Sequence, residues 1–180
     1  MAGKTFKLKN VRLRYPNLFT TETYKGDDTG KYSATFILDI EEHKEVIAEM
    51  QQEIERICKE SFKVKRLDSA RICLKDGDES GNELYEGKFT IKAANRFNPT
   101  ILSRSREVIA SAAESPFYPG CYVTAVIDFW EQARDGKRIN ANLLGIQFVK
   151  HGERIAEGST IDINEFDDLG DDEDEFESFK

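Results

Sequence analysis

The sequence has few of the residues that build disulfide scaffolds, zinc sites or thiol active sites. It contains three cysteines and two histidines among its 180 residues. Cys58, Cys73 and Cys121 are odd in number and widely spaced, which argues against a disulfide framework and favours a reducing compartment. With only His43 and His151 beside them, no tetrahedral zinc spacing exists.

Long apolar runs are also missing. No segment approaches the roughly 18 apolar residues that a membrane-spanning helix needs. Met1 is followed by Ala-Gly-Lys-Thr instead of the apolar stretch of a signal peptide. We therefore expect a soluble, intracellular protein with no membrane partner.

The common signatures of catalysis and of nucleotide cofactors are absent as well. The sequence contains no GxGxxG motif and no GxxxxGK motif followed by Ser or Thr. It also suggests no Ser/His/Asp or Cys/His arrangement for nucleophilic catalysis. We predict no enzymatic activity, no catalytic residues and no cofactor.

One segment resembles a metal-binding loop. Asp76, Asp78 and Ser80 place oxygen atoms at alternate positions and Gly81 is the sixth residue, as at the start of a calcium loop. The twelfth position is Gly87 instead of glutamate. Because the same residue types form ordinary turns, we predict a hairpin loop without metal. A calcium-dependent or hydrolytic enzyme that uses this loop is the weakest interpretation of the chain.

Acidic residues concentrate at the C-terminus. The net charge is −8, and the last nineteen residues hold ten of the 34 carboxylates but one of the 26 lysines and arginines. The other 161 residues hold 25 basic and 24 acidic residues, a net charge of +1. A segment so rich in carboxylates repels itself and has little apolar surface to bury. We predict one domain over residues 1–160 and a disordered acidic tail over 161–180.

Alternation of apolar and polar residues predicts the strands. The first strand changes phase once, at Asn10, which indicates a bulge. The last two form a long hairpin that turns near residues 134–137. On the first strand of this hairpin, Tyr122 and Trp130 lie opposite the face predicted to enter the core. Strands are expected at residues 6–15, 31–40, 71–75, 89–95, 122–130 and 139–150.

A helical pattern interrupts the strands once. Asp39 followed by Glu42 has the form of a capping box, and apolar residues recur at helical spacing over 41–60. The helix carries seven acidic and three basic residues, which favours a solvated outer face. Residues 102–114 fit either a short helix or an irregular connection. One helix among five to six strands, without strand–helix alternation, predicts a mainly β, small Greek-key barrel.

Basic residues and aromatic rings are interleaved along the predicted barrel. Without the helix and the tail, the chain holds 22 basic and 17 acidic residues, a net charge of +5. Cations neutralise phosphates and exposed rings stack on bases, which is how proteins bind single strands. Packing in the core is the alternative for each ring. Predicted phosphate contacts are Arg12, Arg14, Lys31, Lys92, Arg96, Lys137 and Arg138, and predicted stacking rings are Tyr15, Tyr32, Phe97, Tyr122 and Trp130.

Five short segments resemble, in their order and spacing, a bacteriophage single-stranded-DNA-binding protein family long catalogued as a domain of unknown function. The resemblance covers about residues 5–155. It implies an OB-fold barrel that coats single-stranded DNA during phage replication or recombination, without catalysis, in the cytoplasm of the infected bacterial host. The segments are VRLRYPNLF (11–19), KYSA (31–34), FYPGCY (117–122), LLGIQF (143–148) and HGE (151–153).

The resemblance also implies a role for the tail. Acidic tails of single-strand binders dock replication enzymes and compete with DNA for the basic groove. This chain departs from tails that end in a phenylalanine carboxylate, because Lys180 follows Phe179. The predicted partner-binding residues are Asp171, Asp172, Glu173, Asp174, Glu175, Phe176 and Phe179.

The net charge of −8 supports a second interpretation of a different class. In this interpretation the protein is an acidic interaction adaptor or a DNA mimic, whose helix and tail bind a basic partner and whose barrel binds no DNA. The oligomeric state is open, since the edge strands of an OB barrel offer a route to a homo-oligomer.

Overall fold

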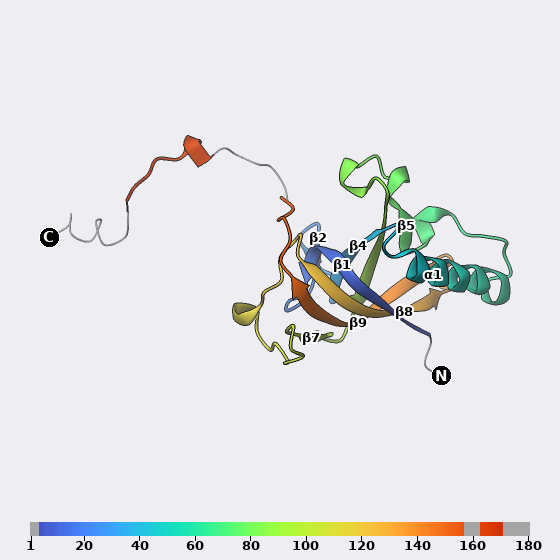
Figure 1. Ribbon diagram of the computed structural model, residues 1–180. Coiled ribbons are helices and arrows are strands. Elements are labelled where there is room, and N and C mark those ends of the chain that lie inside the picture. Colours follow the sequence, from blue (N-terminus) through green and yellow to red (C-terminus); the bar gives the residue numbers. More distant parts are fainter. Residues whose placement is uncertain (1–3, 157–162, 171–180) are drawn as a thin grey trace.

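Five strands form a closed barrel. The computed structural model describes residues 4–156 and 163–170. The barrel strands are β1 (Thr5–Asn17), β4 (Tyr32–Asp39), β6 (Lys88–Asn95), β8 (Tyr122–Gln132) and β9 (Arg138–Lys150). β1 pairs antiparallel with β4 and β8, β4 with β6, and β8 with β9. Ala94 of β6 pairs in parallel with Asn142 of β9 and closes the barrel. Figure 1 shows β1, β8 and β9 curving side by side along one wall of it. This arrangement confirms the predicted OB-fold-like Greek-key barrel.

Four shorter strands accompany the barrel. β5 (Leu74–Asp76) pairs with β6 and β7 (Thr100–Leu102) pairs with β9, so each lies at an edge of the seven-stranded sheet. β2 (Thr23–Tyr24) and β3 (Asp27–Asp28) form a separate hairpin between β1 and β4. β2, β3 and β7 were not predicted from the sequence, because two or three residues are too few to show an alternating pattern.

The predicted bulge in β1 decides which of its residues enter the core. Asn10 has a φ of 56°, and the register of β1 with β8 shifts between Leu8 and Val11. Phe6 and Leu8 before the bulge and Val11 and Leu13 after it are all buried. The extra residue thus keeps the apolar side chains on one face although their spacing changes. Burying a large apolar side chain stabilises the fold by about 1.5–3 kcal/mol.

The two faces of β8 divide as the alternation predicts. Val123, Ala125 and Ile127 are fully buried. Phe129 is half-buried and packs against Phe6, with their ring centroids 4.9 Å apart. Trp130 lies on the other face and is exposed.

The inserted helix is α1 (Lys44–Arg56), which continues into a five-residue π-helix, Ile57–Ser61. Asp39 Oδ1 accepts hydrogen bonds from the backbone N–H groups of Glu41 and Glu42, both at 3.0 Å. The reciprocal bond of a capping box is not made, because the Asp39 N–H donates to Nδ1 of His43 instead. The predicted helix over 41–60 is therefore correct in type, with a turn over its first three residues.

The remaining helical segments are single 3₁₀ turns at Ser69–Arg71, Gly77–Glu79, Glu83–Tyr85, Ala112–Glu114 and Ile163–Glu165. The connection after β7 is irregular, since between Leu102 and Glu114 it contains only a β-bridge to Val108 and one such turn. Of the two alternatives for residues 102–114, the irregular connection is correct.

The loop that resembles a calcium site uses its oxygen atoms to hold its own turns. Asp76 Oδ1 accepts from the N–H of Asp78 at 2.9 Å, and Asp78 Oδ1 accepts from the N–H of Gly87 at 2.8 Å. The Ser80 hydroxyl donates to the carbonyl of Gly77 at 2.6 Å. Among the described residues, no group of three His, Cys, Asp or Glu side chains is placed to hold a metal ion.

Two predictions concern parts of the chain that the structure covers incompletely. None of the helices described over 4–156 and 163–170 is long and apolar enough to cross a membrane. Of the predicted disordered tail, 161–180, the structure describes only residues 163–170. All seven predicted partner-binding residues, 171–176 and 179, lie outside the described residues. Within 163–170, Phe166 and Leu169 are exposed.

The capping carboxylate of Asp39 predicts a pH-dependent stability. Lys88 Nζ donates to Asp39 Oδ2 at 2.7 Å, and this bond, with the N–H of Glu42, lowers the pKa of the carboxyl from 3.8 to about 2. A lowered pKa in the folded state stabilises the fold above pH 3.8, and the contribution is lost as the pH falls through 2. We expect D39A, which also removes the cap, to lose about 1 kcal/mol at neutral pH.

D39N separates the charge from the cap, since an amide oxygen still accepts the two N–H groups. Urea unfolding should show wild type more stable than D39N at pH 7, with the difference shrinking as the pH falls from about 4 to 2. A difference of the same size at pH 2 would contradict this assignment.

Candidate nucleic-acid interface

A groove of about 880 Å³ lies on the outer surface of the barrel. It is bounded by the loop that contains β2 and β3, by the chain around β5, and by the hairpin that joins β8 to β9. The second and third strands of an OB barrel and the loops beside them form the surface where this fold binds oligonucleotides. The corresponding strands here are β4 and β6. The lining residues are Glu22, Thr29, Lys31, Ala70, Arg71, Ile72, Cys73, Lys75, Lys92, Ala94, Asn95, Arg96, Phe97, Trp130, Gln132, Arg138, Ile139, Asn140, Ala141 and Asn142.

The groove is strongly basic. Of the charged residues that line it, six are cations and one, Glu22, is an anion. Positive charge gathered in a concave surface attracts polyanions and raises their association rate. The cations are Lys31, Arg71, Lys75, Lys92, Arg96 and Arg138.

The pleat of β6 directs one of these cations outward. Ile91 and Ala93 are fully buried, and Lys92 between them points away from the core. Lys92 is paired across the sheet with Thr35 of β4. The alternation that builds the core therefore also places a lysine on the floor of the groove.

Two arginines of the groove are held by backbone carbonyls. Arg71 Nη1 donates to the carbonyl of Lys137, and Arg138 Nη1 donates to the carbonyl of Ala70, both at 3.4 Å. Gly136 makes room for this contact, because a Cβ at its position would lie 2.4 Å from Arg71 Nη1. Its φ of +100° also favours glycine. The β8–β9 turn and the residues before β5 thus fix each other.

Two aromatic rings line the groove. Phe97 is 79% exposed, and its backbone N–H donates to Oδ1 of Asn95 at 3.1 Å. Asn95 Nδ2 in turn donates to the carbonyl of Leu143 on β9 at 3.2 Å. Trp130, 38% exposed, lies on β8 opposite Asn140 of β9. Exposed rings beside cations provide the surfaces on which unpaired bases stack.

Six of the twelve residues predicted to contact DNA line this groove. They are Lys31, Lys92, Arg96, Phe97, Trp130 and Arg138. Lys137 does not line the groove, because its Nζ donates to the carbonyl of Phe62 at 3.0 Å and lies 5.9 Å from the centroid of the Phe62 ring. Tyr32 is half-buried and is not among the lining residues.

The other four predicted contacts lie elsewhere on the barrel. Arg12 donates to the carbonyls of Gly120 and Glu153. The Arg14 guanidinium lies 4.5 Å from the ring centroid of Tyr15 and donates to the hydroxyl of Tyr85. DNA contacts by all twelve residues remain predictions, both for the six that line the groove and for the six outside it, Arg12, Arg14, Tyr15, Tyr32, Tyr122 and Lys137.

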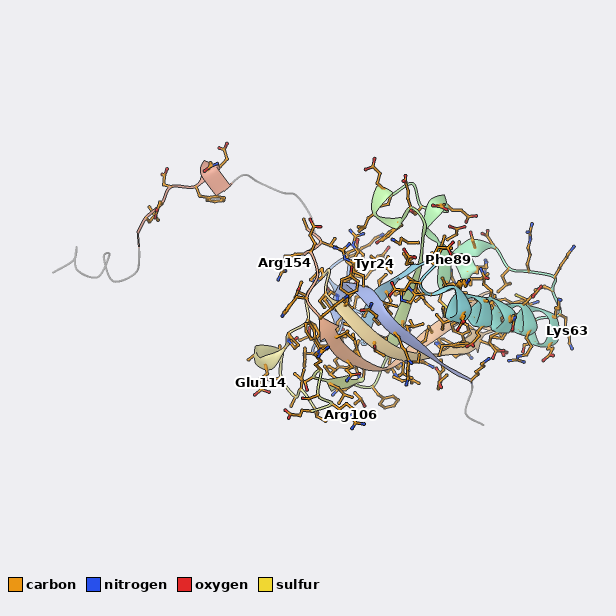
Figure 2. All side chains as sticks on the ribbon, in the orientation of Figure 1. Tyr24, Lys63, Phe89, Arg106, Glu114 and Arg154 are labelled. Carbon is orange, nitrogen blue, oxygen red and sulfur yellow. The ribbon has the colours of Figure 1, made fainter. Side chains whose placement is uncertain are left out.

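A second basic and aromatic cluster surrounds Tyr122. Lys150 Nζ lies 5.0 Å from the centroid of the Tyr122 ring, and the Arg154 guanidinium lies 4.9 Å from that of Tyr118. The Tyr118 hydroxyl bonds with Nδ1 of His151 at 3.0 Å. Arg154 lies where the chain leaves the barrel after β9 (Figure 2). Because these groups bond to one another, the cluster holds the C-terminal segment of the barrel in place.

Several polar lining residues were missed by the sequence analysis. Arg71 and Lys75 belong to a segment predicted as a short strand, and its position beside β9 depends on a distant contact. The N–H of Cys73 donates to the carbonyl of Ile139 at 3.0 Å, which brings this segment to the groove. Local alternation carries no signal for such a pairing.

Cys73 is the thiol that lines the groove, and its surroundings make it a poor nucleophile. Burial raises the pKa of Cys73 to about 12. The thiol is therefore protonated at neutral pH, whereas a reactive cysteine is a thiolate. The pKa of Cys121 is also raised by burial.

Comparison with known proteins identifies the family. Residues 4–177 match the family described as Enterobacter phage Enc34, ssDNA-binding protein. The chain belongs to this family. A curated relative, putative protein p50 of Acyrthosiphon pisum secondary endosymbiont phage 1, is 31% identical over 172 residues, which cover 91% of this chain and 92% of the relative. The resemblance stated from the sequence is confirmed.

Solved structures of the Enc34 family member share the barrel. The single-stranded DNA-binding protein from bacteriophage Enc34 in complex with ssDNA is 33% identical, with a TM-score of 0.74 over 84% of this chain and 89% of that chain. The same phage protein without DNA is 32% identical, with a TM-score of 0.75 over 89% and 88% of the two chains. Bacteriophage T7 gp2.5, at 12% identity and a TM-score of 0.60 over 94% and 98%, shares the fold.

Proposed function

We propose that this protein binds single-stranded DNA in the groove between the β2–β3 hairpin and the β8–β9 turn, without reading its sequence. The observation that carries this proposal is the combination of six cations with two exposed rings on the OB-fold surface. An Enc34 relative with the same barrel was solved in complex with ssDNA, which supports the proposal.

The chemistry of the groove favours single strands over duplexes. Lys31, Lys92 and Arg138 neutralise phosphates, and counterion release makes the affinity depend on salt. Phe97 and Trp130 stack on bases, which are accessible only where they are unpaired. Because stacking uses the face that every base presents, binding by these groups tolerates any sequence.

The acidic tail supplies the second part of the proposal. It competes with DNA for the groove and recruits replication or recombination proteins in the cytoplasm of the infected bacterial host. The support is the separation of charge, with ten carboxylates in the last nineteen residues and a net charge of +1 in the rest. The barrel acts by binding, without catalysis.

Substitutions in the groove test the binding site. F97A and W130A should each weaken binding to labelled oligo-dT by about 5- to 150-fold, because a stacked base contributes about 1–3 kcal/mol. R96A and R138A should each flatten the plot of log K against log salt by about 0.7. Fluorescence anisotropy at several salt concentrations measures both effects, and melting temperatures confirm that the variants fold.

Matched controls lie outside the groove. Val108, on the connection after β7, is an apolar side chain of similar exposure at 72%, so V108A should retain wild-type affinity. Lys65 is an exposed cation beyond α1, and K65A should retain the wild-type salt slope. A preference of the wild type for duplex, or equal losses in the controls and the groove variants, would refute the proposed function.

Deletion of residues 162–180 tests the tail. The deletion changes the net charge from −8 to +1, so the truncated chain should bind oligo-dT several-fold more tightly than the full chain at low salt. The gain should fade as salt screens the competition. An acidic adaptor or DNA mimic would instead lose its basic partner on truncation and gain no affinity for DNA.

A further inference from the structure

One carboxylate lies inside the basic groove. Lys92 Nζ donates to Glu22 Oε1 at 2.7 Å, and the Ser33 hydroxyl donates to Glu22 Oε2 at 3.1 Å. Glu22 is the sole acidic residue among those that line the groove. An anion in a surface that receives a polyanion opposes binding, so its position calls for a physical explanation.

Hydrogen bonds fix both the backbone of Glu22 and the serine that binds its carboxylate. The Glu22 N–H donates to the carbonyl of Lys31, and the Glu22 carbonyl accepts from the N–H and from the hydroxyl of Thr29, all at 2.8 Å. These bonds fix the base of the β2–β3 hairpin. Ser33 is fully buried, and its hydroxyl accepts from Asn17 Nδ2 at 3.3 Å.

The Lys92 ammonium that binds this carboxylate suits a phosphate equally well. An ammonium is a typical donor to the phosphate oxygens of DNA. The Lys92 side chain is 54% exposed, whereas that of Glu22 is 24% exposed, so an incoming phosphate can reach the lysine. Because this ion pair is partly exposed to solvent, it contributes little to stability, and a phosphate contact can replace it.

We propose that Glu22 occupies, in the free protein, the position that a DNA phosphate takes at Lys92, and that it limits affinity for single-stranded DNA. This inference rests on the proposed function of the groove. In free protein Lys92 and Glu22 together carry no net charge. Binding of a phosphate at Lys92 therefore leaves an uncompensated carboxylate next to the strand.

The variant E22Q tests this assignment, because glutamine keeps the shape and removes the charge. We expect the full-length variant to bind oligo-dT about three- to tenfold more tightly than wild type at low salt. Its salt slope should be steeper by about 0.7, since the site then brings one net positive charge to the strand. Glu114 is an exposed carboxylate outside the groove, so E114Q changes the net charge equally and should bind like wild type.

A double variant shows whether the gain acts through Lys92. In the background of K92M, adding E22Q should give a smaller gain than in wild type, because it then relieves general repulsion but frees no lysine. A gain of undiminished size in E22Q/K92M, or an equal gain in E114Q, would reduce the effect to general charge and overturn the inference.

The outcomes separate this inference from the proposed function. If wild type does not bind oligo-dT in a salt-dependent way, the proposed function fails. If wild type binds and E22Q, with an unchanged melting temperature, binds equally or more weakly, the inference alone fails. If E22Q melts early, E22A provides the same comparison, and absence of a gain in the folded fraction overturns the inference.

Discussion

The parallel pairing of β6 with β9 is the constraint on which the functional surface depends. These strands are distant in sequence and meet at Ala94 and Asn142, which closes the barrel. Closer to the start of β9, Ile72 pairs with Ile139 in place of β6. β9 thus pairs first with the chain around Ile72 and then with β6. As a result, the chain from Ala70 to Lys75 lies along the groove.

This closure gathers charges that the sequence scatters. Lys31 lies just before β4, Lys92 belongs to β6 and Arg138 begins β9, yet all three line the groove. Half of the chain's 34 acidic residues lie elsewhere, seven over residues 41–60 and ten after residue 161. Glu22 is the exception among the lining residues, and its pairing with Lys92 gives the groove an internal competitor.

Alternation within strands was enough to predict the barrel and part of its binding surface. The bulge at Asn10, the inner face of β8 and the exposure of Trp130 all follow from local pattern. Alternation does not separate Lys137 from Arg138, because Lys137 lies in the turn before β9. Its Nζ donates to the carbonyl of Phe62, whereas Arg138 begins β9 and lines the groove.

What the sequence did not show depends on contacts between distant segments. Arg71 enters the groove because the residues before β5 pair with β9, and no local pattern encodes that pairing. The β2–β3 hairpin is two residues per strand, too short for periodicity, yet it carries Glu22 to its partner Lys92. Family resemblance agreed with the barrel that the strand pattern predicted and indicated the class of ligand, whereas the position of the groove came from the structure.

The central claim is the path of the strand across the barrel. Ultraviolet cross-linking of oligo-dT to the full-length protein, followed by mass spectrometry of the peptides, locates that path directly. The account predicts adducts on Phe97 and Trp130 within the groove. Adducts confined to the second basic and aromatic cluster, on Tyr118 and Tyr122, with none in the groove, would contradict it.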